Sequence, residues 1–219
     1  RRLLAHAIRT VPYYAQAYRG QINSSQNLSR FHVDDLARLS VLEKEAIRRN
    51  PDLFVSRSVN VKHLHTYYTS GTTGTPLAIK FTNKMHRTWS AAYEARVRRW
   101  AGIDFRMSRA MIGGRIVVPK ANAAPPFWRY NLVERQLYMS AFHISPDNVP
   151  HYVQALNRYK PDYLVGYASS HYFLARMICE EALDVHRPKA VLTSSEKLTS
   201  DMRETIKMAY GCPVFDAYS

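Results

Sequence analysis

The stretch YYTSGTTGTP at residues 67–76 concentrates side chains that can hold an anion. Gly71 and Gly74 have no Cβ atom, so the backbone N–H groups beside them can turn toward a phosphate. Hydroxyl groups that donate hydrogen bonds are carried by Thr69, Ser70, Thr72, Thr73 and Thr75. Neutral donors in such a turn suit a hairpin that closes over a nucleotide and reopens. An ordinary Gly/Thr hairpin turn has the same composition, so composition alone leaves both interpretations open.

This loop is not a Walker A loop. That motif, G-x-x-x-x-G-K-[ST], requires a lysine, a strand before it and a helix after it. Here the two glycines are three residues apart, Thr75 and Pro76 stand where lysine and hydroxyl are required, and a strand-like segment follows. The dinucleotide fingerprint G-x-G-x-x-G is absent as well. The sequence therefore excludes a P-loop NTPase and carries no Rossmann fingerprint.

Two strand-like segments must position the loop. HLHTYYT (63–69) is aromatic and β-branched, and PLAIKFT (76–82) alternates in polarity, so each predicts a strand. Residues 1–60 predict a small helical segment, in which Pro12 interrupts an amphipathic helix over 3–18. Further helices are expected at 33–38, 42–49 and 83–101.

Residues 61–219 predict an α/β nucleotide-binding subdomain. Short strands are expected at 109–114 and 115–119, and 121–127 is expected to be a loop. Beyond it, strands predicted at 136–142, 162–167, 189–194 and 213–219 alternate with helices predicted at 145–159, 169–183 and 199–211. This alternation predicts a mostly parallel sheet flanked by helices. Ligands in such sheets bind at the loops beyond the carboxyl ends of the strands.

The net charge of +14 makes nucleic acid the first partner to consider, since 31 Lys and Arg face 17 Asp and Glu. The basic residues are spread along the chain, however, and clusters such as RVRRW (96–100) lie in helix-like segments. A solvated cationic face or an anionic small ligand, such as a nucleotide or a CoA thioester, accounts for the charge better. Nucleic acid is therefore an unlikely partner.

Other residue types restrict the class of protein. Cys179 and Cys212 are far apart in sequence, which favours free thiols in a reducing compartment and thus the cytoplasm. No apolar run approaches the length of a membrane span, and the first residues lack a signal-peptide core. His63 and His65 share a strand face, but no further ligands lie near them, so no metal site is expected within this chain.

The loop string TSGTTGTP closely resembles the signature [ST]-S-G-[ST]-[TS]-G-x-P of the adenylate-forming superfamily, which includes acyl- and aryl-CoA ligases. Thr75 departs from the lysine that is common at x. VPYY (11–14) and DLARLSVLEKEAIRRN (35–50) resemble the start of phenylacetate–CoA ligase-like proteins. PPFWRYN, RQLYMSAFHIS and KPDYLVGYASS look most like the capsule-biosynthesis (CapK-like) branch, with Ala168 replacing the proline of its GYPSS string. The resemblance covers nearly the whole chain.

The resemblance implies a reaction in two steps. A small-molecule carboxylate, aryl or small acyl, attacks the α-phosphate of ATP to give acyl-AMP and pyrophosphate. CoA then attacks the acyl carbon and AMP leaves. The implied cofactors are ATP, Mg²⁺ and CoA. The oligomeric state stays open, a homodimer included.

The resemblance also implies roles for particular residues. The phosphate loop comprises Thr69, Ser70, Gly71, Thr72, Thr73 and Gly74. The adenine and AMP site comprises Ser194, Ser195, Glu196, Asp216, Ala217, Tyr218 and Ser219. The acyl pocket is expected to include Tyr167, Ala168 and Ser169, together with Gly113 and Gly114. Structural alternatives are a dipole-complementing charge at a helix start for Glu196, a core aromatic for Tyr218, and a strand end or tight turn for the pocket residues.

The family's catalytic Lys and its Mg²⁺-binding Glu are expected beyond Ser219, as the resemblance stops inside the family's Y-G-x-[ST]-E motif. We therefore expect the isolated 219 residues to show little or no ligation. Three alternatives remain open. The first is an adenylate former that passes its acyl group to an amine, a hydroxyl or a sugar-linked acceptor. The second is a non-catalytic nucleotide-binding module, and the third is a nucleic-acid binder, which is supported by charge alone.

Overall fold

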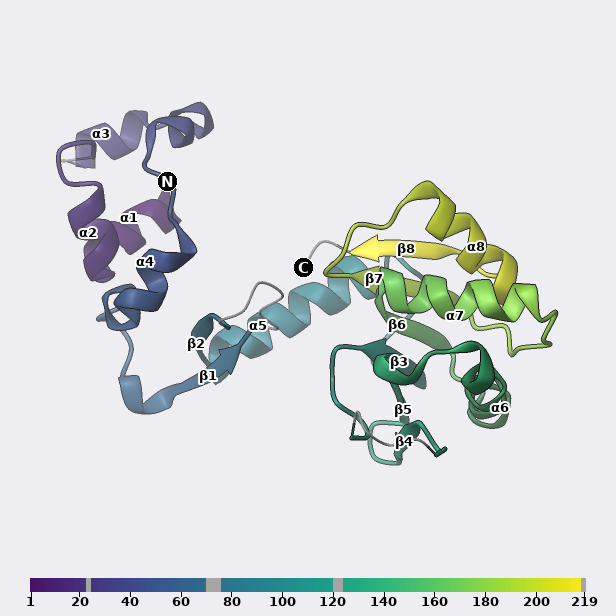
Figure 1. The fold of residues 1–219 in the computed structure, drawn as a ribbon. Coiled ribbons are helices and arrows are strands. Elements are labelled where there is room, and N and C mark those ends of the chain that lie inside the picture. The colour runs from purple at the N-terminus through teal and green to yellow at the C-terminus, as the bar shows by residue number, and fades with distance from the viewer. Residues whose placement is uncertain (23–24, 70–75, 120–123, 218–219) are drawn as a thin grey trace. The chain divides into compact units, whose positions relative to one another are not determined.

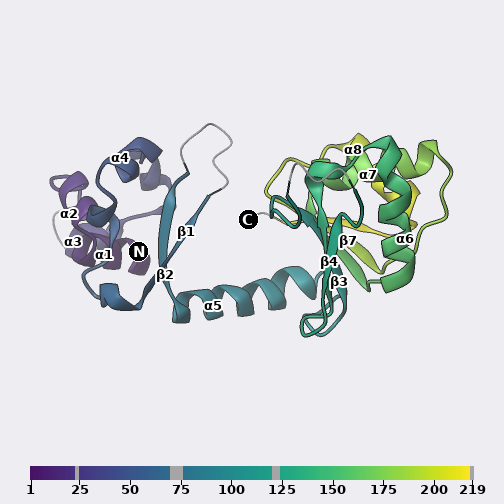
Figure 2. The ribbon, with the colours of Figure 1, turned by 60° about the horizontal axis from the view of Figure 1, so that its bottom comes forward.

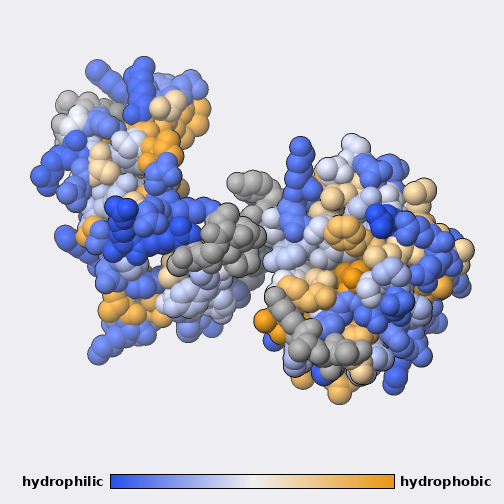
Figure 3. Space-filling model, viewed as in Figure 1, coloured by the Kyte–Doolittle hydropathy of each residue, from blue (hydrophilic) through white to orange (hydrophobic). Residues whose placement is uncertain are grey.

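The computed structural model describes residues 1–22, 25–69, 76–119 and 124–217 (Figure 1). Two compact units divide the chain, Arg1–Trp89 and Ser90–Ser219. Hydrophilic residues cover much of the visible face of each unit, with apolar patches between them (Figure 3). In the part of the chain that is described, no helix has both the length and the apolar composition needed to cross a bilayer.

The first unit begins with short helices. Val11 adopts an extended conformation directly before Pro12, as residues before proline prefer, and thereby separates the first two helices. The predicted interruption at Pro12 is confirmed. The helical elements are α1 (Arg2–Thr10), α2 (Pro12–Ala17), α3 (Ser25–Arg30) and α4 (Lys44–Arg49), with 3₁₀ turns at Val33–Arg38, Pro51–Phe54 and Val61–His63.

The same unit contains a two-stranded antiparallel sheet, β1 (Leu64–Tyr68) and β2 (Ala78–Thr82). Both strands were predicted. They form a sheet of their own, and Lys80 Nζ of β2 lies 3.0 Å from Asp52 Oδ1 in the helical part. Figure 2 shows the hairpin beside those helices. The compact unit therefore extends to Trp89, past residue 60, where the composition changes.

The helix α5 (Asn83–Tyr93) follows the hairpin and continues as a π-helical turn at Glu94–Arg98. Arg98 Nη1 contacts Glu94 Oε2 at 2.9 Å within this turn. The helix expected over 83–101 is thus present, but its last part is wound differently. Such π turns are rare and often mark positions under functional constraint.

The second unit is built on a six-stranded sheet in the order β4-β5-β3-β6-β7-β8. All neighbours pair in parallel except β4 and β5, which are antiparallel. The strands are β3 (Arg109–Gly113), β4 (Trp128–Asn131), β5 (Gln136–Ser140), β6 (Tyr163–Tyr167), β7 (Ala190–Ser194) and β8 (Val214–Ala217). The predicted α/β fold with a mostly parallel sheet is confirmed.

Two details of the predicted strands differ from expectation. Residues 115–119 form no strand, although their sequence is rich in β-branched side chains. Instead, Trp128–Asn131 forms the antiparallel edge strand β4. A four-residue strand after two prolines carries too short an alternation to be predicted from pattern alone.

Both faces of the sheet carry buried apolar side chains. On one face, apolar side chains of α6 (Val149–Tyr159), α7 (Ala168–Glu180) and α8 (Ser200–Tyr210) pack against strand residues such as Ile112 and Val191. On the other, Ala190 and Leu192 pack against Ile103 and its neighbours. Because successive side chains of a strand alternate between faces, β7 begins with a continuous apolar run, Ala190–Leu192.

Gly166 of β6 sets how closely β3 and β6 approach. A Cβ atom at this position would lie 1.8 Å from the carbonyl oxygen of Ile112, its neighbour in the register. We expect Gly166→Ala to lower the free energy of unfolding by about 3 kcal/mol, because backbone must move to admit the methyl group. Chemical denaturation measures this. In the control Gly113→Ala the added atom would meet only the Met111 side chain, at 3.5 Å, so an equal loss there would contradict the explanation.

His171 of α7 makes stability depend on pH. The side chain is fully buried, and removal from water lowers its pKa from 6.5 to about 4, an effect that the Val165 backbone opposes only in part. The unfolded chain therefore takes up this proton first as the pH falls. We expect about 3 kcal/mol of stability to be lost between pH 6.5 and pH 4. Unfolding curves of His171→Gln, which cannot titrate, should show a flatter pH dependence. The same slope in both proteins would contradict the prediction.

Candidate functional site

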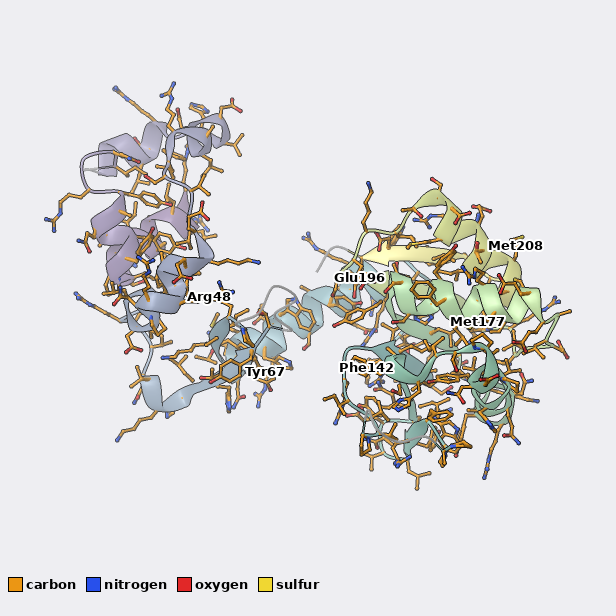
Figure 4. All side chains as sticks on the ribbon, in the orientation of Figure 1. Arg48, Tyr67, Phe142, Met177, Glu196 and Met208 are labelled. Carbon is orange, nitrogen blue, oxygen red and sulfur yellow. The ribbon has the colours of Figure 1, made fainter. Side chains whose placement is uncertain are left out.

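Most of the residues predicted for the adenine and acyl sites lie at one edge of the six-stranded sheet. The parallel strands β3, β6, β7 and β8 end at Gly113, Tyr167, Ser194 and Ala217. The register pairs Ile112 with Gly166, Gly166 with Thr193, and Ser194 with Ala217, so these carboxyl ends are neighbours. Glu196 and Phe142, labelled in Figure 4, mark this edge. Tyr218 and Ser219 lie outside the described residues, and their roles stay predictions.

Glu196 joins the two predicted subsites. Its Oε2 accepts hydrogen bonds from the Ser169 backbone N–H at 2.9 Å and from the Ser169 hydroxyl at 2.6 Å. Ser169 lies in the first turn of α7, whose N-cap residue Tyr167 provides no side-chain cap. The carboxylate of Glu196 therefore caps this helix from another loop and complements its dipole. The dipole interpretation of Glu196 holds, but for α7 rather than for the helix that follows Glu196 in sequence.

Ser195, directly before this carboxylate, has a left-handed backbone with φ 68°. Few residues other than glycine adopt this region, and those that do often lie at functional sites. Ser194 and Glu196 therefore flank a residue whose backbone conformation is unfavourable. The carboxylate contact with Ser169 helps to hold that turn.

Thr193, one residue before the end of β7, also contributes to this edge. The sequence did not predict it as a site residue. It is fully buried, and its hydroxyl donates to Asp216 Oδ1 at 2.8 Å. The two residues are register partners in β7 and β8. This contact orients the carboxylate of Asp216, a predicted adenine-site residue. In the sequence, Thr193 is only a threonine after three apolar residues. Its contact with Asp216 could be inferred only once the pairing of β7 with β8 is known.

Gly114 and Tyr167, both predicted for the acyl side, contact each other. A Cβ atom on Gly114 would lie 2.7 Å from the Tyr167 phenol oxygen, so the ring rests on bare backbone. Ala168 is buried at the start of α7, while Ser169 is half-buried. The structure thus brings the Gly113–Gly114 turn and the β6–α7 junction together, as expected for one site.

A buried polar cluster at the end of β5 was also missed. Ser140 Oγ lies 2.8 Å from His143 Nδ1, and the Tyr152 hydroxyl donates to the Ser140 carbonyl at 2.6 Å. Burial raises the pKa of Tyr152, so it stays a protonated donor. Because Ser140 pairs with Gly113 in the register, this cluster adjoins the acyl-side residues. Serine and histidine three residues apart are too common to be singled out from sequence.

The predicted phosphate loop lies in the other unit, between β1 and β2. Thr69 N–H donates to the Leu77 carbonyl at 3.0 Å, and Leu77 N–H donates to Thr69 Oγ1 at 3.0 Å. These two bonds close the base of the loop. The strand after the loop confirms that it is not a Walker A element. Ser70, Gly71, Thr72, Thr73 and Gly74 lie outside the described residues, so their phosphate contacts stay predictions.

Over 1–22, 25–69, 76–119 and 124–217, no three side chains of His, Cys, Asp or Glu gather in a group that could hold a metal ion.

The Glu196–Ser169 contact can be tested by a double-mutant cycle. We expect Glu196→Ala to destabilise the second unit by about 1 kcal/mol, because an exposed charged hydrogen bond and a helix cap are lost. Glu196→Gln should lose less, and Ser169→Ala should add little once Glu196 is absent. Thermal denaturation provides the free energies. Glu181→Ala, at the opposite end of α7, serves as the control, and fully additive losses at Glu196 and Ser169 would show that the contact carries no energy.

We compared the sequence and the fold with those of known proteins. No family model matches the chain. Protein CapK of Staphylococcus aureus is 31% identical over 202 residues, which cover 91% of this chain and 44% of that protein. The fold matches that of 2-hydroxyisobutyryl-CoA ligase in an open conformation with 2-HIB-AMP and CoA, at a TM-score of 0.67 and 21% identity, over 100% of this chain and 51% of that one. The postadenylation state of the same ligase in complex with R3-HIB-AMP gives a TM-score of 0.68 at 19% identity.

The chain thus spans about half the length of the relatives that it matches. The expected resemblance to CapK-like proteins is confirmed by the sequence match, and the expected fold is confirmed by the match to a CoA ligase. The chain is similar in sequence to Protein CapK, and its fold is that of about half of 2-hydroxyisobutyryl-CoA ligase.

Proposed function

We propose that this chain provides nucleotide- and acid-binding parts of an enzyme that activates a carboxylic acid with ATP and transfers the acyl group to CoA. One observation carries the proposal. The residues predicted for adenine and for the acid meet at a single sheet edge, where Glu196 and Ser169 bond directly. An adenylating enzyme must hold these two ligands next to each other, because the acid's carboxylate attacks the α-phosphate.

Under this proposal, different residues would hold the phosphates, the adenine nucleotide and the acid. The loop from Thr69 to Gly74 would steady the β- and γ-phosphates with neutral donors while pyrophosphate leaves. The β7 turn at Ser194–Glu196 and the β8 end at Asp216–Ser219 would hold the adenine nucleotide. Tyr167–Ser169 and Gly113–Gly114 would flank the acid. No side-chain nucleophile is needed, since the acid itself attacks.

The cofactors follow from this chemistry. The structures of 2-hydroxyisobutyryl-CoA ligase contain an acyl-adenylate and CoA, which supports ATP and CoA as ligands here. Mg²⁺ would offset phosphate charge, but the described residues contain no cluster to hold it, and we assign no residue of this chain to it.

A second candidate shares the first step and differs in the acceptor. The strings KPDYLVGYASS and RQLYMSAFHIS resemble the capsule-biosynthesis branch, which favours an amine, hydroxyl or sugar-linked acceptor. Acyl-transfer assays with CoA and with amine or sugar acceptors distinguish the two.

The adenylation step is tested by ATP–pyrophosphate exchange. We expect the full-length protein to exchange label in the presence of at least one acid from a panel of aryl and short acyl acids. Saturable ATP binding without exchange would instead favour the non-catalytic module. Salt-dependent DNA binding without nucleotide binding would overturn the enzyme altogether.

Thr69→Val tests whether the base of the loop matters for turnover. Valine keeps the shape of threonine but cannot accept the Leu77 N–H bond, so the loop loses one of its two closing bonds. We expect the exchange rate to fall about fivefold, equivalent to about 1 kcal/mol for one hydrogen bond. Thr10→Val, which removes a hydroxyl contact to the His6 carbonyl on α1, is the control. Equal rates in the wild type and in Thr69→Val would contradict a role for this bond.

A further inference from the structure

Bare backbone separates Tyr167 from Ser140 at the carboxyl edge of the sheet. Gly113 pairs with Ser140 on β5 and, by the register of β3 with β6, stands next to Tyr167 on its other side. Apart from its neighbours in the chain, a Cβ atom on Gly113 would have one described atom within 4 Å, Met111 Cε at 3.5 Å. Tyr167 and Ser140 therefore flank an open position in a row that crosses three strands.

His143 is held beside Ser140 by contacts on several sides. It ends a 3₁₀ turn, Ala141–His143, that starts directly after β5. Its Nδ1 lies 2.8 Å from Ser140 Oγ, its ring stacks on Phe127 at 5.1 Å between centroids, and its carbonyl accepts from Asn148 Nδ2 at 3.0 Å. The imidazole is therefore fixed in place before any ligand binds.

The second ring nitrogen of His143, Nε2, has no hydrogen-bond partner in the part of the chain that the structure describes. The residue is 9% exposed and Nε2 itself is buried. In either neutral tautomer this nitrogen carries an N–H group or a lone pair. Leaving such an atom buried and unpaired is costly, and the cost is removed when a bound molecule or an ordered water supplies the hydrogen bond.

The order of the strands indicates which ligand would reach His143. The predicted adenine residues end β7 and β8, whereas β5 lies on the far side of β3 from them. Two strand spacings, about 10 Å, separate β5 from β6. An acid whose carboxylate reacts beside the nucleotide would extend from β6 across Gly113. It would reach β5 with the end that is remote from its carboxylate.

We propose that His143 selects the acid, through a hydrogen bond between Nε2 and a polar group at the remote end of the acid. This inference rests on the proposed function and narrows its substrate to acids such as 4-hydroxybenzoate, in which a hydroxyl group stands opposite the carboxylate. A hydroxyl group can donate and accept, so it pairs with Nε2 in either tautomer. A hydroxyl group beside the carboxylate, as in 2-hydroxybenzoate, would remain on the β6 side of Gly113. His143 is thus a specificity-determining residue.

ATP–pyrophosphate exchange by the full-length protein tests the proposal. The panel consists of aryl and short acyl acids in matched sets, such as benzoate with its 2-hydroxy and 4-hydroxy derivatives, and butyrate with 4-hydroxybutyrate. In every set that supports exchange, we expect the acid with the remote hydroxyl group to be used about tenfold more efficiently than the others. The reason is that Nε2 stays buried and unpaired when that hydroxyl group is missing.

Two substitutions separate this hydrogen bond from the packing of the ring. His143→Asn keeps an amide within reach of Ser140 Oγ but has no atom at the position of Nε2, so the preference should disappear. His143→Gln places its amide near the position of Nε2 and should keep most of the preference. A merely structural role would give no such order. Because the preference is a ratio of two rates in one protein, a partly unfolded variant still reports it.

His151→Asn is the matched control. This half-buried histidine of α6 also contacts Phe127, at 6.2 Å between ring centroids, but it is not bonded to Ser140. We expect it to keep the preference of the wild type.

Two outcomes would overturn the proposal. Equal efficiencies within every set in the wild type would mean that the acid does not pair with Nε2 and that an ordered water satisfies it instead. A preference that survives in His143→Asn would assign the hydroxyl group to another residue. The proposed function fails separately, through absence of exchange with every acid, so the two failures are distinguishable.

Discussion

The close approach of β6 to β3 at Gly166 is the constraint on which the candidate site depends. Because no Cβ atom stands between them, Gly166 lies against the Ile112 backbone, and the parallel strands keep a common register. That register carries on through β7 to β8 and brings four carboxyl ends to one edge. Glu196 then bonds Ser169 across two of those ends. A shift of one residue in the register would separate every contact described at this edge.

The sequence predicted the parts of the site that are local. Strand–helix alternation indicates which turns lie at the carboxyl edge, as Tyr167–Ser169 and Ser194–Glu196 do, whereas the phosphate loop stays a prediction. Contacts between strands could not be predicted in the same way. Thr193 and Asp216 are 23 residues apart and meet only through the register. The strand at Trp128–Asn131 was missed because four residues carry too little periodicity.

The candidate sites of the two units differ in their chemistry. At the sheet edge of the second unit, hydroxyls and backbone predominate, with carboxylates at Glu196 and Asp216. In the first unit, an acid-free stretch joins cations to the neutral donors of the loop. Neutral donors and carboxylates suit an uncharged base and ribose, whereas cations suit phosphates.

The start of α7 shows which part of a nucleotide the sheet edge suits. Helix starts in α/β folds commonly bind phosphate, because free N–H groups and the dipole favour an anion. At α7 that position is already taken by the Glu196 carboxylate, which accepts from the Ser169 N–H and hydroxyl. A phosphate there would meet a negative charge instead of free donors, so the adenine edge is a poor place for the phosphates. Under the proposed function, the Gly/Thr loop, in a segment without a single acidic residue, is therefore the better candidate for the phosphates.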